Sequence, residues 1–149
     1  LAGEFRNELL SKGAVALDDG TYETLRFYNR MPIYGPDMDE TTIVPELGID
    51  EMISYSKGCY IGQEIIARIH FRGHVAKRLT GLSLSSKVEA GTELKTVDGK
   101  NAGRVTSVTF SPKVESVIAL GYVRYDYLTA GTELVAGDAK AVVTDLPFI

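Results

Sequence analysis

A change in hydrophobic period near Arg78 constrains the fold more than any other feature of this sequence. Before it, Ile61, Ile65 and Ile69 recur every four residues, which is typical of a helix that buries one face. After it, apolar residues alternate with a period of two, and glycines mark frequent turns. The alternation over residues 117–125 assigns two sets to opposite faces of one strand, Val117, Ala119, Gly121, Val123 and Tyr125 against Ile118, Leu120 and Tyr122. The pattern therefore predicts a helical first half and an antiparallel second half.

A short internal repeat supports this division. The segment Ala90-Gly-Thr-Glu-Leu94 recurs as Ala130-Gly-Thr-Glu-Leu134, and each copy is followed by a glycine turn and a strand pattern. Two similar hairpin units favour a barrel, because a closed sheet leaves no edge strand unpaired. We predict an α+β fold with a small antiparallel β-barrel over residues 79–149, and we interpret the repeat as a folding feature.

Two helices are predicted in residues 1–30. Gly13 is placed to end the first helix, and the apolar run Ala14–Leu17 is interpreted as the end of a strand. The aspartates at positions 18 and 19 offer an N-cap for the second helix, which Pro32 stops. Because the chain opens with Leu1 in helix-like sequence, we expect a fragment or a processed chain.

Charge is unevenly distributed along the chain. Residues 36–51 hold six carboxylates and no basic side chain, which we interpret as a solvated loop (Asp37, Asp39, Glu40, Glu46, Asp50, Glu51). Glu46 has apolar neighbours and is expected to face inward. Residues 57–78 carry a net charge of +4, so they could pair with the acidic stretch or frame a pocket for an anion. The net charge of −4 excludes a global basic field for nucleic-acid binding.

Composition excludes some further classes of protein. Unbroken apolar runs do not exceed four residues, whereas a spanning helix needs about 20, so we expect a soluble protein, cytoplasmic or, in a eukaryote, organellar. One cysteine excludes an internal disulfide framework and a four-ligand zinc site. His70 and His74 suggest a metal site with Cys59, but Gly73 separates them and no fourth ligand is evident, so we expect none.

The most informative segment for chemistry is Lys57-Gly-Cys-Tyr-Ile-Gly-Gln-Glu64, followed by Arg68. Cys59 is the one plausible nucleophile or redox group, because Lys57 and the amides at a helix start both favour a thiolate. The flanking glycines let the backbone turn tightly and approach a ligand. The competing interpretation is packing, since a lone cysteine is often a small buried hydrophobe.

This segment resembles the K-G-C-Y-x-G-Q-E-x-x-x-R signature of the YgfZ-like folate-binding proteins, which are linked to iron–sulfur protein maturation. All eight specified positions match. These proteins are relatives of the glycine-cleavage T-protein, an aminomethyltransferase. Residues that resemble a stretch common to both branches lie upstream, namely Leu25-Arg26, Met31-Pro-Ile-Tyr-Gly35, Asp39-Glu40, Pro45-Glu46 and Gly48. T-proteins generally have an Asp-Phe-Ile-Gly-Arg-type sequence in place of Cys59–Gln63, which favours the YgfZ-like branch.

The resemblance implies three modules around a central hole that holds tetrahydrofolate. This chain would supply the end of a ferredoxin-like folate-binding module (residues 1–56), the signature segment with its helix (57–78) and the C-terminal barrel (79–149). The first module, which carries an aspartate central to T-protein catalysis, would be absent. A second chain is one way of supplying it.

The resemblance also implies roles for individual residues. Glu46 matches the glutamate that T-proteins use against the pterin, and a carboxylate can accept two hydrogen bonds from an aminopyrimidine edge; the alternative is a loop or capping acid. Tyr34 would stack near the ring or belong to the core. Arg68 would meet the glutamate tail of folate or pair with Glu64. Lys57 would orient the loop or favour the thiolate of Cys59, the expected catalytic group.

The implied function is a tetrahydrofolate-binding accessory protein of the YgfZ type, which serves iron–sulfur proteins or their maturation factors, or tRNA modification. Whether the chain is an enzyme, as a folate-dependent transferase would be, stays open. One alternative is a true aminomethyltransferase, which would need the absent module and a lipoyl-carrier partner. The other is a non-catalytic protein- or RNA-binding module, and the negative net charge and the lack of clustered aromatic residues argue against RNA.

Overall fold

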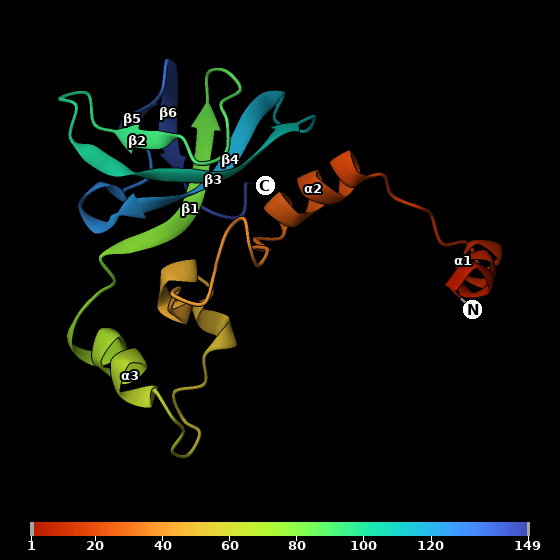
Figure 1. Ribbon diagram of the computed structural model, residues 1–149, viewed down its shortest axis with the longest axis horizontal. Helices are drawn as coiled ribbons and strands as arrows, with labels where there is room; N and C mark the ends of the chain where they lie inside the picture. The colour runs from red at the N-terminus through yellow and green to blue at the C-terminus, as the bar shows by residue number, and fades with distance from the viewer. Residues whose placement is uncertain (1, 149) are drawn as a thin grey trace.

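Six antiparallel strands close into a barrel in the second half of the computed structural model, which describes residues 2–148 (Figure 1). The order around the barrel is β1-β4-β3-β2-β5-β6. The strands are β1 (Lys77–Leu84), β2 (Glu93–Lys95), β3 (Asn101–Ser111), β4 (Ser116–Arg124), β5 (Glu133–Ala136) and β6 (Ala139–Thr144), with a short 3-10 helix η3 (Tyr125–Tyr127) after β4. The predicted barrel is confirmed, and its first strand begins just before residue 79.

The two copies of the repeat make the same turn before β2 and before β5. In each copy the glycine N–H donates a hydrogen bond to the carbonyl of a valine, and the N–H of the same valine donates one to the threonine carbonyl, at 2.8–3.0 Å. The valine is Val105 of β3 for the first copy and Val143 of β6 for the second. The leucine that closes each copy, Leu94 or Leu134, is fully buried. The repeat is therefore a folding device, and the strands that its two copies lead into, β2 and β5, pair with each other.

The alternation along β4 separates two hydrophobic clusters, as the sequence predicts. One face points into the barrel, where Ala119 and Val123 pack with Leu82, Leu94 and Leu134. The opposite face packs against the first half of the chain, through Ile118, Leu120 and Tyr122 against Phe27, Leu47 and Ile49. Both faces of β4 are therefore buried, one by the barrel and one by the segment that carries the candidate site.

The first half contributes helices and 3-10 turns. In chain order they are α1 (Ala2–Ser11), α2 (Asp19–Tyr28), η1 (Val44–Leu47), η2 (Asp50–Met52) and α3 (Gln63–Arg72). The predicted N-cap of α2 is confirmed, because the Asp18 carboxylate accepts hydrogen bonds from the Thr21 N–H and hydroxyl, both at 2.9 Å. These bonds hold the pKa of Asp18 below its usual value. Phe27 of α2 is fully buried against the barrel.

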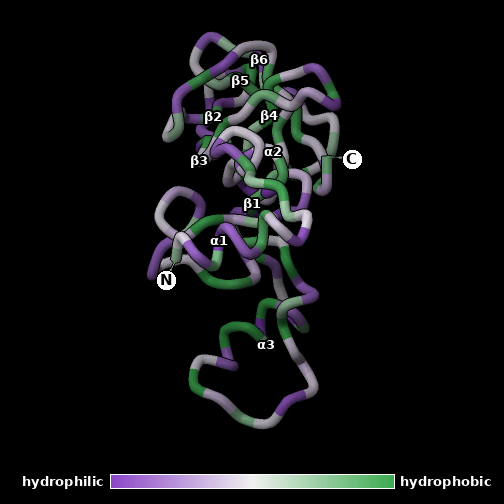
Figure 2. Tube along the Cα trace, turned by 90° about the vertical axis from the view of Figure 1, so that its right-hand side faces the viewer, coloured by the Kyte–Doolittle hydropathy of each residue, from purple (hydrophilic) through white to green (hydrophobic). Residues whose placement is uncertain are grey.

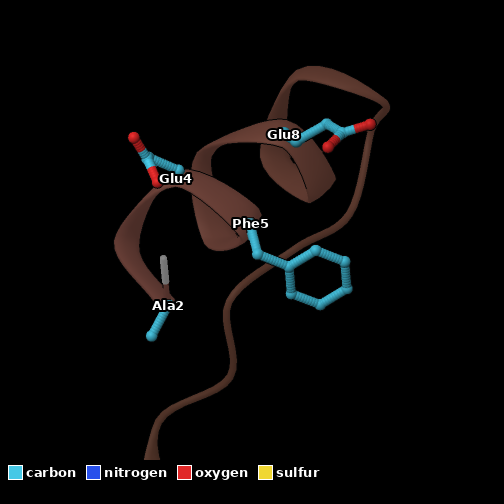
Figure 3. A pocket seen from close by; sticks show the side chains of 4 residues that line it. All are labelled: Ala2, Glu4, Phe5 and Glu8. Atoms are coloured by element: carbon cyan, nitrogen blue, oxygen red, sulfur yellow. The ribbon is translucent and has the colours of Figure 1, made fainter.

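Helix α1 stands apart from the rest of the structure (Figure 1). None of its residues is buried, and the described residues that line the hollow beside Phe5 all belong to α1 (Figure 3). The predicted strand end at Ala14–Leu17 is wrong: these residues have no regular structure and Val15 is 81% exposed. No strand of residues 2–148 lies beside them to supply ladder hydrogen bonds, so an apolar run alone does not make a strand here.

The burial predicted for the isoleucine stripe is also wrong. Helix α3 begins at Gln63, so Ile61 precedes it and is fully exposed, and no residue of the helix is buried. Helix α3 and the loop before it extend away from the barrel (Figure 2). Gly73 ends the helix as predicted. The period correctly identifies a helix, but within residues 2–148 its apolar face is covered only in part: Ile65 is half exposed, and Ile66 and Ile69 are partly buried.

Asp37 corrects the prediction that the acidic stretch is a solvated loop. Its carboxylate is buried and accepts hydrogen bonds from the Arg26 guanidinium (2.7 Å) and from the hydroxyls of Thr106 and Ser107 (2.6 Å each). Its backbone carbonyl accepts a bond from the Tyr122 hydroxyl at 2.9 Å. Asp37 therefore fastens the segment that follows α2 to strands β3 and β4.

Residues 2–76 contain no strand other than an isolated bridge between Tyr34 and Met38. The α+β class is thus established by the barrel and its helices, and the assignment of residues 1–56 to a ferredoxin-like module stays a prediction. Within residues 2–148, no helix is both long enough and apolar enough to cross a membrane.

Candidate functional site

A mainly apolar hollow of about 360 Å³ lies between the segment of residues 42–54 and the signature loop. Its walls come from both sides: Thr42, Ile43, Val44, Met52, Ile53 and Ser54 from the first, and Lys57, Tyr60, Ile61, Gly62 and Ile66 from the second. We call it the signature hollow. An apolar recess with a cation at its rim can hold a flat ring that carries a negative group.

The signature loop turns into α3 at Gly62, whose positive φ of 87° suits glycine. The Gln63 side chain accepts a hydrogen bond from the Tyr60 N–H at 3.2 Å, so this glutamine shapes the turn. The Lys57 ammonium lies 4.3 Å from the centroid of the Tyr60 ring. Cys59 is a free, exposed thiol, so the competing interpretation of a buried structural cysteine does not hold in this structure.

Glu46 lies in η1, next to the start of the barrel. Its side chain is only 14% exposed, in agreement with the inward orientation predicted from its apolar neighbours. One carboxylate oxygen is 4.0 Å from the Lys77 ammonium. The turn after η1 is held by Arg30, which donates a hydrogen bond to the Gly48 carbonyl at 2.9 Å. Glu46 is therefore a carboxylate on a supported turn, with one cation beside it.

Tyr34 and Arg68 do not line the signature hollow. Tyr34 is 65% exposed, and its hydroxyl donates a hydrogen bond to Glu40 at 3.2 Å, so the alternative of a core tyrosine does not hold. Arg68 is exposed on α3 beside Arg72, and no ion pair joins it to Glu64. Among residues 2–148, no hydrogen bond, ion pair or ring contact joins any two of the five predicted site residues. Their roles stay predictions.

A second hollow, which the sequence did not indicate, lies on the outer face of the barrel. It encloses about 370 Å³, and its liners include the basic side chains of Lys77, Arg104 and Arg124 and the Tyr122 ring. Pairing register brings them together, because β4 places Arg124 opposite Lys77 on β1 and Tyr122 opposite Arg104 on β3. We call it the barrel hollow. Its one sequence signal is Lys77, the member of the basic stretch that also approaches Glu46.

The two histidines make ring contacts with tyrosines. His70 stacks on Tyr55 with ring centroids 3.7 Å apart, and His74 stacks on Tyr125 at 3.6 Å. The part of the chain that the structure describes contains no group of three histidine, cysteine or carboxylate side chains suited to a metal ion. The two histidines thus hold α3 at its C-terminal end, one against the preceding loop and one against the residues after β4.

The comparison with known protein families gives a match for the barrel. Residues 77–149 match the family model of the glycine cleavage T-protein C-terminal barrel domain, and this match starts at the first residue of β1. The barrel of this chain is thus similar to the C-terminal barrel domain of the glycine-cleavage T-proteins. The part of the predicted resemblance that concerns the T-protein barrel is therefore confirmed, while the YgfZ-like branch stays a prediction.

Several relatives match nearly the whole chain, not the barrel alone. An aminomethyltransferase of Thermosynechococcus vestitus is 35% identical over 145 residues, which cover 94% of this chain and 39% of the relative. An aminomethyltransferase of Synechocystis is 36% identical over 126 residues (83% and 34%). A chloroplastic protein of Arabidopsis thaliana that carries the name of a transferase is 34% identical over 142 residues (95% and 33%). This chain thus spans about a third to two fifths of the length of these relatives.

The fold has a counterpart among solved structures. The crystal structure of the glycine cleavage system aminomethyltransferase T from Bartonella henselae matches 85% of this chain and 37% of its own, with a TM-score of 0.73 and 24% sequence identity. The likeness supports the fold of the barrel together with much of the first half.

Proposed function

We propose that this chain is the folate-binding, C-terminal portion of a folate-dependent transferase of the T-protein type. The observation that carries the proposal is the extent of the similarity to aminomethyltransferases, which reaches 94% of the chain and so includes residues around the signature hollow as well as the barrel. The aminomethyltransferase alternative is better supported by these relatives than the YgfZ-like function that the signature favoured. Net charge and fold add no support for a nucleic-acid-binding module.

The residues present suit tetrahydrofolate. The signature hollow offers apolar walls for a flat ring, and Tyr60 contributes an aromatic face. Glu46, on the neighbouring turn, can accept two hydrogen bonds from an aminopyrimidine edge. When bound, tetrahydrofolate would accept the one-carbon unit. This chain's own part is to bind and orient the folate, and Lys57 at the rim would attract its negative end.

Calorimetric titration of tetrahydrofolate tests this proposal. We would use the chain and a hybrid in which it replaces the matching region of the T. vestitus aminomethyltransferase. The chain alone should bind weakly, because part of the wall is absent. The hybrid should bind more tightly and transfer the methylene group of an aminomethyl-lipoyl carrier to tetrahydrofolate, with release of ammonia and of the carrier as its dithiol. Glu46→Gln should weaken binding in both. Glu51→Gln, an exposed acid on the next turn, is the matched control. A folded hybrid without folate binding would contradict the proposal.

The YgfZ-like function is a second candidate, favoured by the eight-position signature and by the exposed Cys59 at its centre. It predicts that Cys59→Ser abolishes activity in cells while thermal stability is preserved. A T-protein-like transferase predicts that the hybrid retains aminomethyl transfer with Cys59→Ser. One substitution therefore separates the two candidates.

We also propose that a module outside this sequence, in the same chain or in a second one, covers α1 and α3. Both helices are without buried residues, and Phe5, Ile65 and Phe71 are at least half exposed. The relatives are long enough to supply such a module, since the chain matches 33–39% of their length in the three comparisons above. Added in trans, the N-terminal part of the T. vestitus relative should protect these helices from hydrogen exchange; unchanged exchange would argue against it.

A further inference from the structure

Helix α2 ends in a backbone motif in which glycine is the usual residue, yet this chain has an arginine there. The Arg30 N–H donates a hydrogen bond to the Phe27 carbonyl at 3.2 Å, and the Met31 N–H donates one to the Arg26 carbonyl at 2.9 Å. Such a pair of bonds forms a Schellman motif, in which the residue after the C-cap adopts the left-handed conformation. Arg30 is that residue, with a φ of 55°. Because a side chain is unfavourable in this conformation, its presence indicates a role beyond ending the helix.

The side chain of Arg30 reaches the turn that follows Glu46. Its Nη2 donates a hydrogen bond to the Gly48 carbonyl at 2.9 Å, and its Nη1 lies 3.9 Å from the Glu51 carboxylate. The ion pair with Glu51 is long, and the carboxylate is 62% exposed, so this contact contributes little. The bond to Gly48 is short and partly shielded, since the Arg30 side chain is 31% exposed. The contact that explains an arginine at this position is therefore the bond to Gly48.

Gly48 directly follows η1, so this bond acts on the position of Glu46. A single 3-10 turn has few hydrogen bonds of its own, and its orientation depends on contacts with its surroundings. The turn lies against β1, since a Cβ added to Gly48 would be 3.4 Å from the Leu79 carbonyl. Two elements thus hold the turn, Arg30 after α2 and the strand β1. In this arrangement the Glu46 carboxylate lies 4.0 Å from the ammonium of Lys77, the first residue of β1.

We propose that Arg30 is a positioning residue for Glu46. It holds the turn after η1, so that the carboxylate keeps the orientation in which it accepts hydrogen bonds from the folate ring. This inference rests on the proposed function, which assigns the aminopyrimidine edge of the folate to Glu46. Arg30 does not line the signature hollow, so its effect on the ligand is indirect. A group that orients a binding carboxylate changes the affinity only through that carboxylate.

Arg30→Gly separates positioning from folding, because glycine suits the left-handed conformation and the substitution removes only the side chain. We would titrate tetrahydrofolate into the 149-residue chain and into the hybrid described above, each with and without the substitution. The melting temperature should change little, whereas tetrahydrofolate should bind about fivefold to tenfold more weakly, since the ordering lost is that of one hydrogen bond. In the hybrid, KM for tetrahydrofolate should rise while kcat is kept. Glu51→Gln removes the weak ion pair, keeps the bond to Gly48 and is the matched control.

A double-mutant cycle in the hybrid tests whether Arg30 acts through Glu46. Once the carboxylate is removed its position no longer matters, so Arg30→Gly/Glu46→Ala should bind tetrahydrofolate as weakly as Glu46→Ala alone. Losses that add in full would overturn the proposal, because Arg30 would then act at another place. Unchanged affinity in Arg30→Gly would also overturn it, and both results leave folate binding intact. A melting temperature lowered by more than about 5 °C would assign Arg30 to the fold instead. If neither the chain nor the hybrid binds tetrahydrofolate, the proposed function itself fails, and the positioning role fails with it.

Discussion

Replacing Asp37 by alanine should destabilise the protein more than any other change in the acidic stretch. The carboxylate is fully buried and accepts four hydrogen bonds, from Arg26, Ile33, Thr106 and Ser107, at 2.6–3.0 Å. Its removal leaves the Arg26 guanidinium, itself 3% exposed, without its buried counter-charge. The arginine keeps its contact with Glu23 at 2.8 Å, which limits the loss.

The expected cost can be worked from these contacts. Removing one partner of a buried ion pair costs about 3–5 kcal/mol, because the other charge stays buried and uncompensated. The Glu23 contact moves the charge penalty toward the lower end of that range, whereas the orphaned Ser107 hydroxyl adds about 1 kcal/mol or more. We therefore expect the free energy of unfolding to fall by about 4 kcal/mol, a large part of the about 5–15 kcal/mol typical of a domain.

Urea denaturation followed by circular dichroism measures this loss. Asp39→Ala, two residues along in an exposed position, is the matched control and should move the midpoint far less. The double variant Arg26→Met/Asp37→Leu should be more stable than Asp37→Ala, since it removes both buried charges together. A loss below about 1 kcal/mol for Asp37→Ala would refute the argument that this cluster fastens the segment to the barrel.

Three further predictions follow from single residues. Burial raises the pKa of Tyr122, so the unfolded state ionises first and stability should fall as pH rises above about 10; Tyr122→Phe should flatten that decline in alkaline urea titrations. Gly103→Ala should cost more than about 3 kcal/mol in the same assay, because an added Cβ would lie 1.9 Å from a backbone carbonyl, whereas Gly58→Ala meets nothing within 4 Å and should be nearly neutral. Iodoacetamide should modify Cys59 in the folded protein, and a thiol that reacts only after denaturation would contradict its exposed position.

The barrel could be predicted from sequence because its signals are local. The alternation along β4 correctly assigned Val123 to one face and Tyr122 to the other, and the repeat marked two equivalent turns. The same reasoning failed for α3. Periodicity states which residues share a face, but what covers that face depends on elements outside the periodic segment, and within residues 2–148 Ile65 stays half exposed.

The acidic stretch shows why partners distant in sequence escape such reasoning. Asp37 resembled its solvated neighbours, since its hydroxyl partners lie 69 and 70 residues away on β3. Nothing in the local composition distinguishes it from Asp39, whose carboxylate is exposed and bonded to Thr41. The barrel hollow escaped for the same reason, because the register between three strands brings Arg104 and Arg124 together.

The reversal of charge between residues 36–51 and 57–78 left two possibilities open, mutual pairing or a pocket for an anion. Among the described residues, one ion pair joins the two stretches, the 4.0 Å approach of Glu46 to Lys77. Mutual neutralisation is therefore nearly absent: Lys57 turns to the Tyr60 ring, and Arg68 makes no ion pair. Because Lys57 and Arg68 are exposed to solvent, the absence of carboxylate partners costs little stability, and it leaves both charges available to an anionic ligand such as a folate.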